Sequence, residues 1–471
     1  MLEPSCRACA QSPGQGAIPD TAPGCADEAA LLDHPSRLFV EVTSRCNLRC
    51  PMCVKQSAGG HAPDGDMSRE TFAALEPAFS RLDALILNGI GEPLMHPRLE
   101  EFIRAGKRAM PAGSWVGFQT NGHLLDKDRA LALMDAGLDM IFLSVDAAAP
   151  ERFETVRKGG VLGHVARALD ALARAKKDVA DAKLEVGAEF VIMRENMHEL
   201  PAVVSWLGER GVTRLVVSHI LPFAAAMADQ PVFGINSPDA VRFYRQWAKM
   251  ARQDRIDLGR YFGVLWKYDK SPEESRIVAF VKAMAAAASQ ADIPFHVGNL
   301  MAGEDLSQAR EVFRQARAVA TDVGVRLNLP ALTPLSDHVC LGVKRGGAFI
   351  AWDGKVSPCH FLWRDSHCHF YGRKKEVAQR VFGEVPRNTL AEVWNSPAYA
   401  AFRADVVRRR YPHCPGCNVY PCEDIDRADF ENDCYGETVP CGDCLWSMGL
   451  LQCLGQEDVD GVFQAHDKLP S

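Results

Sequence analysis

The chain has 471 residues, of which 47% are hydrophobic and 24% charged, proportions that are ordinary for a soluble globular protein. Its formal net charge of -7 gives no electrostatic reason to expect nucleic acid or an anionic membrane as a partner. No apolar stretch approaches the roughly 20 residues of a membrane span, and the N-terminus lacks the pattern of an export signal. We therefore expect a cytoplasmic protein of two or three domains.

The 16 cysteines are many more than an ordinary cytosolic enzyme needs. Without an export signal, lasting disulfides are a poor explanation, and metal sites are a better one. Cys6, Cys9 and Cys25 fall in residues 1–36, which are rich in Pro, Gly and Ala. We predict a disordered N-terminal arm there and assign these three thiols no role.

Three further thiols follow the first predicted strand, which alternates apolar residues over 38–42. Cys46, Cys50 and Cys53 have the spacing C-x3-C-x2-C. A structural zinc site usually takes four protein ligands, and no fourth Cys follows for hundreds of residues. An iron–sulfur cube normally takes four thiolates, so a cube held by three leaves one iron open to another ligand.

The segment C-N-L-R-C-P-M-C resembles the cluster motif of the radical S-adenosylmethionine (SAM) superfamily. The resemblance implies a [4Fe-4S] cluster on Cys46, Cys50 and Cys53 whose open iron chelates SAM. It also implies that an electron from this cluster cleaves SAM to methionine and a 5′-deoxyadenosyl radical, which abstracts a hydrogen atom from the substrate. A triplet of this spacing could alternatively hold a structural metal.

Strands and helices alternate after Leu38. Ser68 is a plausible N-cap for a helix with apolar residues at Phe72, Leu75, Phe79 and Leu82. Further strands are predicted at 84–87, 115–119, 140–145, 184–192 and 214–218. Six such strands favour an α/β fold of parallel βαβ units, either a barrel or a doubly wound sheet. The radical SAM resemblance implies a (βα)6 partial TIM barrel with its site at the carboxyl ends of the strands.

Polar and glycine residues follow these strands where a cofactor would lie. Glycines after the second strand allow close backbone approach to a ligand, and a glutamate there can accept a hydrogen bond from an ammonium. This segment resembles the family's G-G-E motif, which contacts the amino group of SAM. Thr120 and Asn121 at the end of the third predicted strand, and Ser144 and Asp146 at the end of the fourth, match positions that approach SAM in the family. Ser and Asp at strand ends also commonly cap the next helix. The implied SAM-binding residues are Gly89, Gly91, Glu92, Thr120, Asn121, Ser144 and Asp146.

Residues 222–337 form an insertion without a recognisable motif. Helical patterns are predicted at 240–253, 274–290 and 306–320, with strand-like runs at 293–297 and 325–329. The insertion could extend the barrel or cover the substrate, and the sequence leaves both alternatives open.

The composition changes again from Cys340 onward. Residues 348–356 predict a β-hairpin that turns at Asp353-Gly354. Cys340 and Cys359 bracket it, and their spacing resembles the opening of the SPASM domain, which carries auxiliary iron–sulfur clusters in radical SAM enzymes that act on peptides and proteins. In sulfatase-maturing members an Asp follows the second of these cysteines and acts as a base. His360 stands there in this chain, as a candidate base or a structural residue.

Seven more thiols follow, with a spacing that departs from the usual SPASM pattern: Cys414, Cys417, Cys422, Cys434, Cys441, Cys444 and Cys453. With Cys340 and Cys359 they give nine thiols for the eight positions of two auxiliary [4Fe-4S] clusters. Motif order assigns Cys340 and Cys359 to the first cluster and Cys414, Cys417 and Cys422 to the second, and leaves four undecided. Zinc is the alternative for the C-x2-C pairs. We expect Cys368 to be an ordinary loop thiol.

The domain boundaries that follow from these patterns are an arm at 1–36, a radical SAM core at 37–221, the insertion at 222–337, a SPASM domain at 338–455 and a polar tail at 456–471. The C-terminal end resembles a subgroup of radical SAM/SPASM proteins described as metalloenzyme maturases, including those paired with tungsten cofactor oxidoreductases.

That resemblance implies an enzyme that modifies a protein, or the cofactor of a partner tungsten or molybdenum oxidoreductase, with ferredoxin or flavodoxin as electron donor. One alternative is a peptide-modifying enzyme that forms a thioether or carbon–carbon crosslink. Another is a non-catalytic iron–sulfur electron carrier or scaffold.

Overall fold

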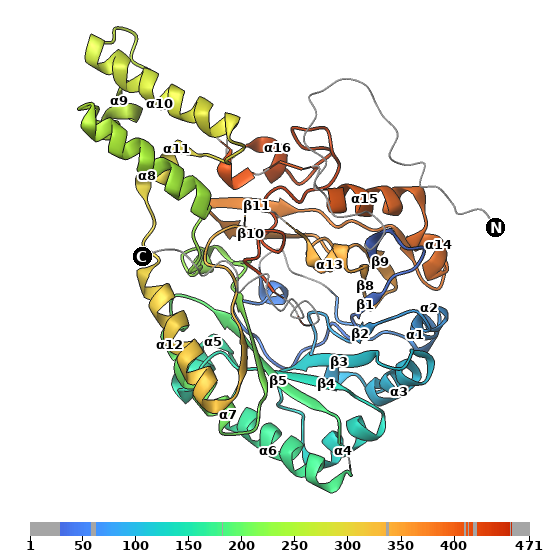
Figure 1. The fold of residues 1–471 in the computed structure, drawn as a ribbon. Helices are drawn as coiled ribbons and strands as arrows, with labels where there is room; N and C mark the ends of the chain where they lie inside the picture. Colours follow the sequence, from blue (N-terminus) through green and yellow to red (C-terminus); the bar gives the residue numbers. More distant parts are fainter. Residues whose placement is uncertain are drawn as a thin grey trace, which may run out of the picture.

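The computed structural model describes residues 29–57, 63–180, 182–335, 339–408, 411–412, 414–417, 422–452 and 454 (Figure 1). Most of the predicted arm at 1–36, the tail at 456–471 and the thiols Cys6, Cys9, Cys25 and Cys453 lie outside these residues.

Ten strands form one sheet in the order β12-β9-β8-β1-β2-β3-β4-β5-β6-β7. From β8 to β7 every neighbouring pair is parallel, whereas β9 and β12 add an antiparallel edge. The sheet has the predicted α/β class but is wider than six strands, because β7 and β8 pair with its two sides. The strands are β1 (Arg37–Val40), β2 (Ala84–Ile86), β3 (Trp115–Thr120), β4 (Met140–Ser144), β5 (Glu185–Ile192), β6 (Arg214–His219), β7 (Arg326–Asn328), β8 (Gly347–Ile350), β9 (Lys355–Ser357) and β12 (Gly383–Glu384).

Helices cover the outer face of the parallel strands (Figure 1). Alternation along β1 explains the two-sided burial: Leu38 and Val40 join the large core beneath these helices, while Phe39 joins a separate cluster on the opposite face. The helices of this part are α1 (Arg69–Ala73), α2 (Glu76–Phe79), α3 (Leu99–Ala109), α4 (Lys127–Asp135), α5 (Pro150–Val156), α6 (Leu162–Asp178) and α7 (Leu200–Gly208).

The predicted helix after Ser68 is interrupted. Ser68 caps α1 as expected, since its hydroxyl accepts a 3.0 Å hydrogen bond from the N–H of Thr71. The chain then breaks into a second short helix, α2, which has Pro77 in its first turn. Proline has no N–H to donate to the preceding turn and its ring clashes there, so one continuous helix is disfavoured.

The insertion divides into two structural parts. Its second half, α12 (Ser307–Val323) and β7, extends the barrel beside α7 and β6. Its first half forms a helical arm that projects from the molecule in Figure 1 and has its own apolar core. The arm comprises α8 (Pro238–Gln253), α9 (Tyr261–Leu265), α10 (Pro272–Gln290) and α11 (Val297–Ala302).

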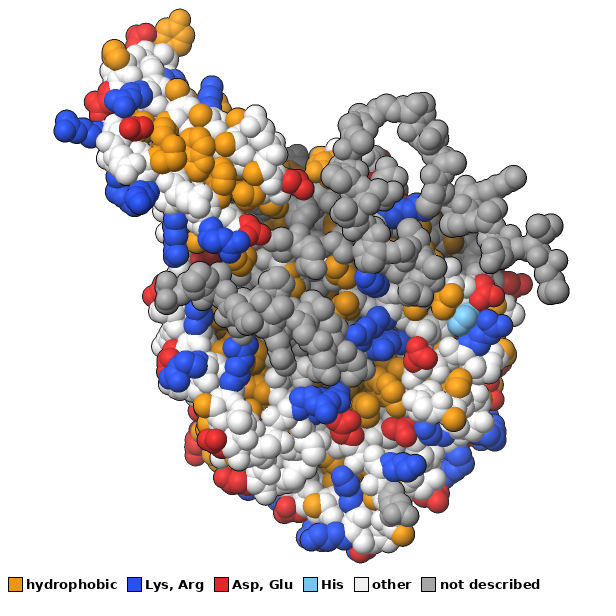
Figure 2. Space-filling view, in the orientation of Figure 1, with side chains coloured by type: hydrophobic (Ala, Val, Ile, Leu, Met, Phe, Trp, Pro, Cys, Tyr) orange, Lys and Arg blue, Asp and Glu red, His pale blue; other side chains and the backbone are white. Residues whose placement is uncertain are grey.

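Hydrophobic side chains gather on the visible face of this arm (Figure 2), and near its tip Trp266 and Tyr268 are 88% and 98% exposed. The predicted strand at 293–297 is wrong. Ile293 and Phe295 pack into the core of the arm instead of pairing with a sheet, and α11 begins at Val297.

The C-terminal part begins with the predicted hairpin, β8 and β9, in which Gly354 has a φ of 89°. A separate two-stranded sheet follows, formed by β10 (Ser366–Phe370) and β11 (Arg373–Val377). Cys368 is a fully buried residue of β10, so the expectation of a loop thiol is wrong. The helices here are α13 (Leu341–Lys344), α14 (Leu390–Trp394), α15 (Pro397–Arg408) and α16 (Glu423–Asp426). Within the described residues, no helix has the length and apolar character needed to cross a membrane.

Candidate active site

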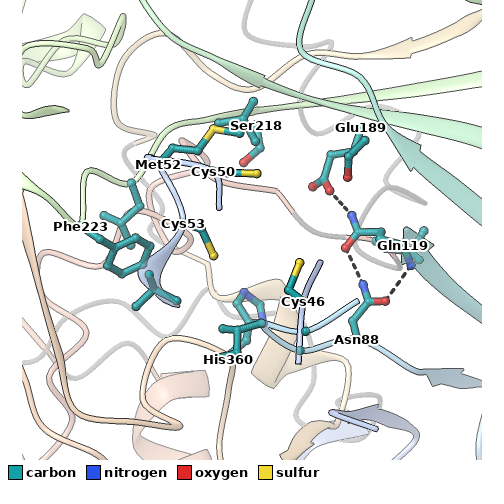
Figure 3. A pocket seen from close by; sticks show the side chains of 18 of the residues that line it. Cys46, Cys50, Met52, Cys53, Asn88, Gln119, Glu189, Ser218, Phe223 and His360 are labelled. Atoms are coloured by element: carbon teal, nitrogen blue, oxygen red, sulfur yellow. Dashed lines mark hydrogen bonds between the residues drawn. The ribbon is translucent and has the colours of Figure 1, made fainter. Parts of the chain in front are cut away.

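A cavity of about 400 Å³ lies at the carboxyl ends of the parallel strands. Cys46, Cys50 and Cys53 point toward it from the loop after β1 (Figure 3). Residues in and after the other central strands line its neighbouring walls, and the C-terminal part of the chain, including His360 and Trp446, closes the opposite side. A cavity of this volume is large enough for a small ligand or cofactor.

Polar contacts hold the cysteine loop in place. The Arg45 guanidinium binds the Asp66 carboxylate through two hydrogen bonds of 2.9 and 2.6 Å. Asn121 Nδ2 donates to Asn47 Oδ1 at 2.7 Å, which ties the loop to the end of β3. Lys55 donates to the carbonyl of Ser44. These bonds fix the loop from which the three thiols project.

Glu92 is buried in the wall of the cavity, and burial raises the pKa of its carboxyl group. Its carboxylate accepts hydrogen bonds from Leu94 N at 3.1 Å, Thr120 Oγ1 at 2.6 Å and Asn121 N at 2.7 Å. A carboxylate has about four lone-pair sites, so one acceptor site remains. The structure thus brings Glu92, Thr120 and Asn121 together.

Close packing within the chain accounts for Gly89 and Gly91, which also line the cavity. A Cβ on Gly89 would lie 2.2 Å from the Glu41 side chain, and one on Gly91 would lie 2.1 Å from the carbonyl oxygen of Thr43. Any side chain at either position would therefore push the loop after β2 away from β1 and the cysteine loop.

Ser144 lines the cavity, whereas Asp146 supports it from behind. Asp146 Oδ2 pairs with Arg157 Nε at 2.6 Å, and its Oδ1 accepts from Val191 N at 2.7 Å. Arg157 itself lines the cavity, and its charge opposes the pKa increase that burial causes at Cys50. Asp146 thus acts on the cavity by positioning Arg157.

A hydrogen-bonded chain that no sequence motif predicts lies on the polar side of the cavity. Asn88 and Gln119 bond to each other, and Gln119 Nε2 donates to Glu189 (Figure 3). All three line the cavity from β3, β5 and the loop after β2. Their only sequence signal is their place in or just after a strand.

Glu41 is a second group that no sequence motif predicts. It follows β1, and its carboxylate accepts from Ile90 N at 3.1 Å and Trp352 N at 3.4 Å. Burial raises its pKa to about 7, an effect that these two hydrogen bonds and the nearby Arg364 oppose. Glu41 therefore connects the loop after β2 with the C-terminal hairpin.

Two histidines line the cavity, His360 from the C-terminal part and His219 from the end of β6. His360 packs edge-on against Trp446, and burial lowers the pKa of His360 to about 4. His219, at the end of β6, has its Nε2 3.0 Å from the carbonyl of Ala331, and burial lowers its pKa to about 4 as well. Both rings are therefore neutral near pH 7. Apolar residues including Leu221, Phe223 and Phe361 also line the cavity.

Eight thiols of the C-terminal part form two sets of four. Cys340, Cys359, Cys441 and Cys444 make up the first set, in which Cys441 interacts electrostatically with the other three. Burial, followed by the charge of a neighbouring thiol, raises the pKa of Cys340, Cys359 and Cys444 to about 12.

The second set consists of Cys414, Cys417, Cys422 and Cys434, which line one small hollow. Burial raises the pKa of Cys434, and the neighbouring Cys417 and Cys422 add to the effect. Motif order left Cys434, Cys441 and Cys444 undecided. The structure brings Cys434 to the second set and the other two to the first.

Comparison with known families matches both parts of the chain. The model of the radical SAM superfamily matches residues 40–207, and the SPASM iron–sulfur cluster-binding domain matches residues 340–418. The fold and the site define a radical SAM enzyme, whose cofactors are SAM and iron–sulfur clusters. The chain thus belongs to the radical SAM superfamily and carries a SPASM domain.

Among curated proteins, the tungsten-containing aldehyde ferredoxin oxidoreductase cofactor-modifying protein of Pyrococcus furiosus is 28% identical over 421 residues, which cover 88% of this chain and 96% of the relative. A GTP 3′,8-cyclase of Chlorobaculum tepidum is 34% identical over 37% of this chain and 50% of its own length. A PqqA peptide cyclase of Granulibacter bethesdensis is 29% identical over 41% of this chain and 49% of its own length.

Solved structures give weaker matches. Streptococcus suis SuiB aligns with a TM-score of 0.48 and 13% identity over 84% of this chain and 73% of its own. Native anSMEcpe with bound AdoMet aligns with a TM-score of 0.45 and 15% identity over 86% of this chain and 94% of its own.

The residues fit the cofactors of the family. Thiolates are the usual ligands of iron–sulfur clusters, and the chain presents one set of three beside a cavity and two sets of four. Buried thiols of raised pKa are protonated and inert by themselves, whereas a bound metal deprotonates them. No three His, Cys, Asp or Glu side chains in the described part of the chain are arranged to hold a single metal ion.

Proposed function

We propose that this radical SAM enzyme modifies the cofactor of a partner tungsten or molybdenum oxidoreductase. The observation that carries the proposal is the similarity to the cofactor-modifying protein of Pyrococcus furiosus, which extends over 88% of this chain and 96% of that protein. The other curated relatives described above match about half of their own length or less.

Within this proposal, Cys46, Cys50 and Cys53 hold the cluster that binds SAM. The common cavity of the three thiols supports this assignment. When bound, the cluster supplies the electron for reductive cleavage of SAM. Glu92 would accept a hydrogen bond from the SAM ammonium at its remaining acceptor site, and Arg157 would balance negative charge beside Cys50.

The two sets of four thiols would hold two auxiliary clusters, one on Cys340, Cys359, Cys441 and Cys444 and the other on Cys414, Cys417, Cys422 and Cys434. Mutual electrostatic interaction supports the first set, and a shared hollow supports the second. Cys453 would then be the thiol left over.

His360 remains the candidate base, because it lines the cavity beside a proposed cluster ligand. Replacing it with alanine should lower turnover of the true substrate while leaving the iron content unchanged. Unchanged turnover would remove His360 from the mechanism. A cytoplasmic location, with ferredoxin or flavodoxin as reductant, completes the proposal.

Peptide modification is the second candidate, favoured by the partial similarity to a PqqA peptide cyclase. Deletion of the gene, followed by mass and metal analysis of the cofactors in partner oxidoreductases, separates the two. Maturation predicts an altered cofactor in one partner. If the deletion strain has unaltered cofactors in its oxidoreductases but lacks a peptide modification, peptide modification is supported instead.

A further inference from the structure

A buried charged network lies beside both sets of four thiols. Asp443 is 1% exposed, and its Oδ1 accepts a 2.7 Å hydrogen bond from Lys375 Nζ. Arg373 donates to Oδ2 of the same carboxylate. Lys375, only 2% exposed, also donates to the carbonyl of Ile425 at 3.0 Å. Lysine is almost never so deeply buried unless it is paired, so this arrangement is a built feature of the domain.

The network lies next to both sets. Asp443 directly precedes Cys444 and follows Cys441 by two residues, and both thiols belong to the first set. Lys375 bonds to Asp443 and to the carbonyl of Ile425, and Ile425 lines the hollow of the second set. The Lys375 ammonium is therefore held beside both sets.

The two sets also meet through the backbone. Gly442, which follows Cys441, accepts a 3.1 Å hydrogen bond at its carbonyl oxygen from the N–H of Cys414. A Cβ at position 442 would lie 2.7 Å from Cys414 Sγ, so a glycine is needed for this approach. One hydrogen bond and two short covalent segments thus connect Cys441 with Cys414.

We propose that the Lys375–Asp443–Arg373 network would set the reduction potentials of the two auxiliary clusters. The inference rests on the assignment of both thiol sets to clusters. Lys375 would act on the bound clusters through its charge, without touching substrate.

The physical reason is the charge of the network. Reduction adds a negative charge to a cluster, and a buried ammonium nearby stabilises that charge because the surroundings screen it poorly. Without Lys375, Asp443 keeps only its arginine partner, and reduction becomes less favourable.

The test is a redox titration, followed by electron paramagnetic resonance, of the full chain reconstituted with iron and sulfide. Lys375→Met should lower the potential of at least one auxiliary cluster by about 59 mV, a tenfold change for a one-electron couple. Lys375→Arg keeps the charge and should stay close to the wild type. Lys374→Met is the matched control, since Lys374 is the neighbouring residue of β11, its side chain is 51% exposed and it pairs with Glu376 at the surface.

Unchanged potentials in Lys375→Met with full iron content would overturn the inference and leave the cluster assignment intact. A wild type without auxiliary clusters would overturn both. If Lys375→Met binds less iron and sulfide than the wild type, the potential is measured on the clusters that it retains, and Lys375→Gln serves as a second variant. The test still holds, because a reduction potential does not depend on how many molecules carry the cluster.

Discussion

Glu41 links parts of the molecule that lie far apart in the sequence. Its carboxylate holds the backbone N–H groups of Ile90 in the loop after β2 and of Trp352 in the C-terminal hairpin. Gly89 leaves the space that this side chain occupies. A single buried carboxylate thus fixes the loop that carries Glu92 relative to the C-terminal half.

The raised pKa of Glu41 predicts a pH-dependent stability. Its pKa is about 7 in the folded chain, against a usual value of 4.5, so the folded state holds the proton more tightly. Stability from this group is present below pH 4.5 and is lost as the pH rises toward 7. Relative to wild type, Glu41→Gln should gain on the order of 3 kcal/mol between pH 4.5 and 8, measured by thermal denaturation at several pH values. Arg364 and Asp353 are the charged groups nearby. If the stability of the wild type and of Glu41→Gln changed with pH in the same way, the raised pKa of Glu41 would be contradicted.

Glu92 offers a test of SAM binding at the same scale. In Glu92→Gln, an amide NH2 group replaces one of the carboxylate oxygens that now accept hydrogen bonds from neighbouring donors. The substitution also removes the negative charge that the SAM ammonium would meet. We expect at least a tenfold loss of SAM affinity, about 1.4 kcal/mol, with the iron content retained. Glu70→Gln, at an exposed position of α1, is the control. Equal affinity in wild type and Glu92→Gln would argue against the role of Glu92.

Local sequence patterns predict the elements well where the cause is local. Alternation finds β1, the turn residues find the hairpin, and Ser68 marks the start of α1. The break before α2 was also readable, because Pro77 cannot continue the preceding turn. The strand expected at 293–297 failed because its apolar residues pack into the helical arm.

The hairpin turn carries a prediction about backbone conformation. Gly354 has a φ of 89°, and a Cβ there would lie 2.0 Å from the carbonyl oxygen of Val385. Gly372, between β10 and β11, has a φ of 75° and nothing within 4 Å of a Cβ. Gly372→Ala should cost about 1–2 kcal/mol from the left-handed conformation alone, and Gly354→Ala should cost more. The thermal unfolding midpoints of the two variants test this prediction. Equal losses of stability would mean that the backbone at Val385 can move away from the added Cβ at little cost.

At the scale of the whole molecule, the site combines two halves of the chain. The barrel contributes three thiols and the polar wall of the cavity, whereas the C-terminal part contributes aromatic side chains including His360, Phe361 and Trp446. The parallel pairing of β1 with β8 joins them. Sequence motifs group Cys46, Cys50 and Cys53, because these lie within one loop. They could not assign Cys434, Cys441 and Cys444, because those groupings arise from contacts between distant segments.

Iron and acid-labile sulfide per chain, measured after anaerobic reconstitution, test the central claim most directly. Three cubes predict about twelve irons in the wild type. Alanine at Cys46, Cys50 and Cys53 together should leave about eight, and alanine at Cys340, Cys359, Cys441 and Cys444 together should also leave about eight. About four irons in the wild type, falling to none in the first variant, would contradict the account of the C-terminal thiols.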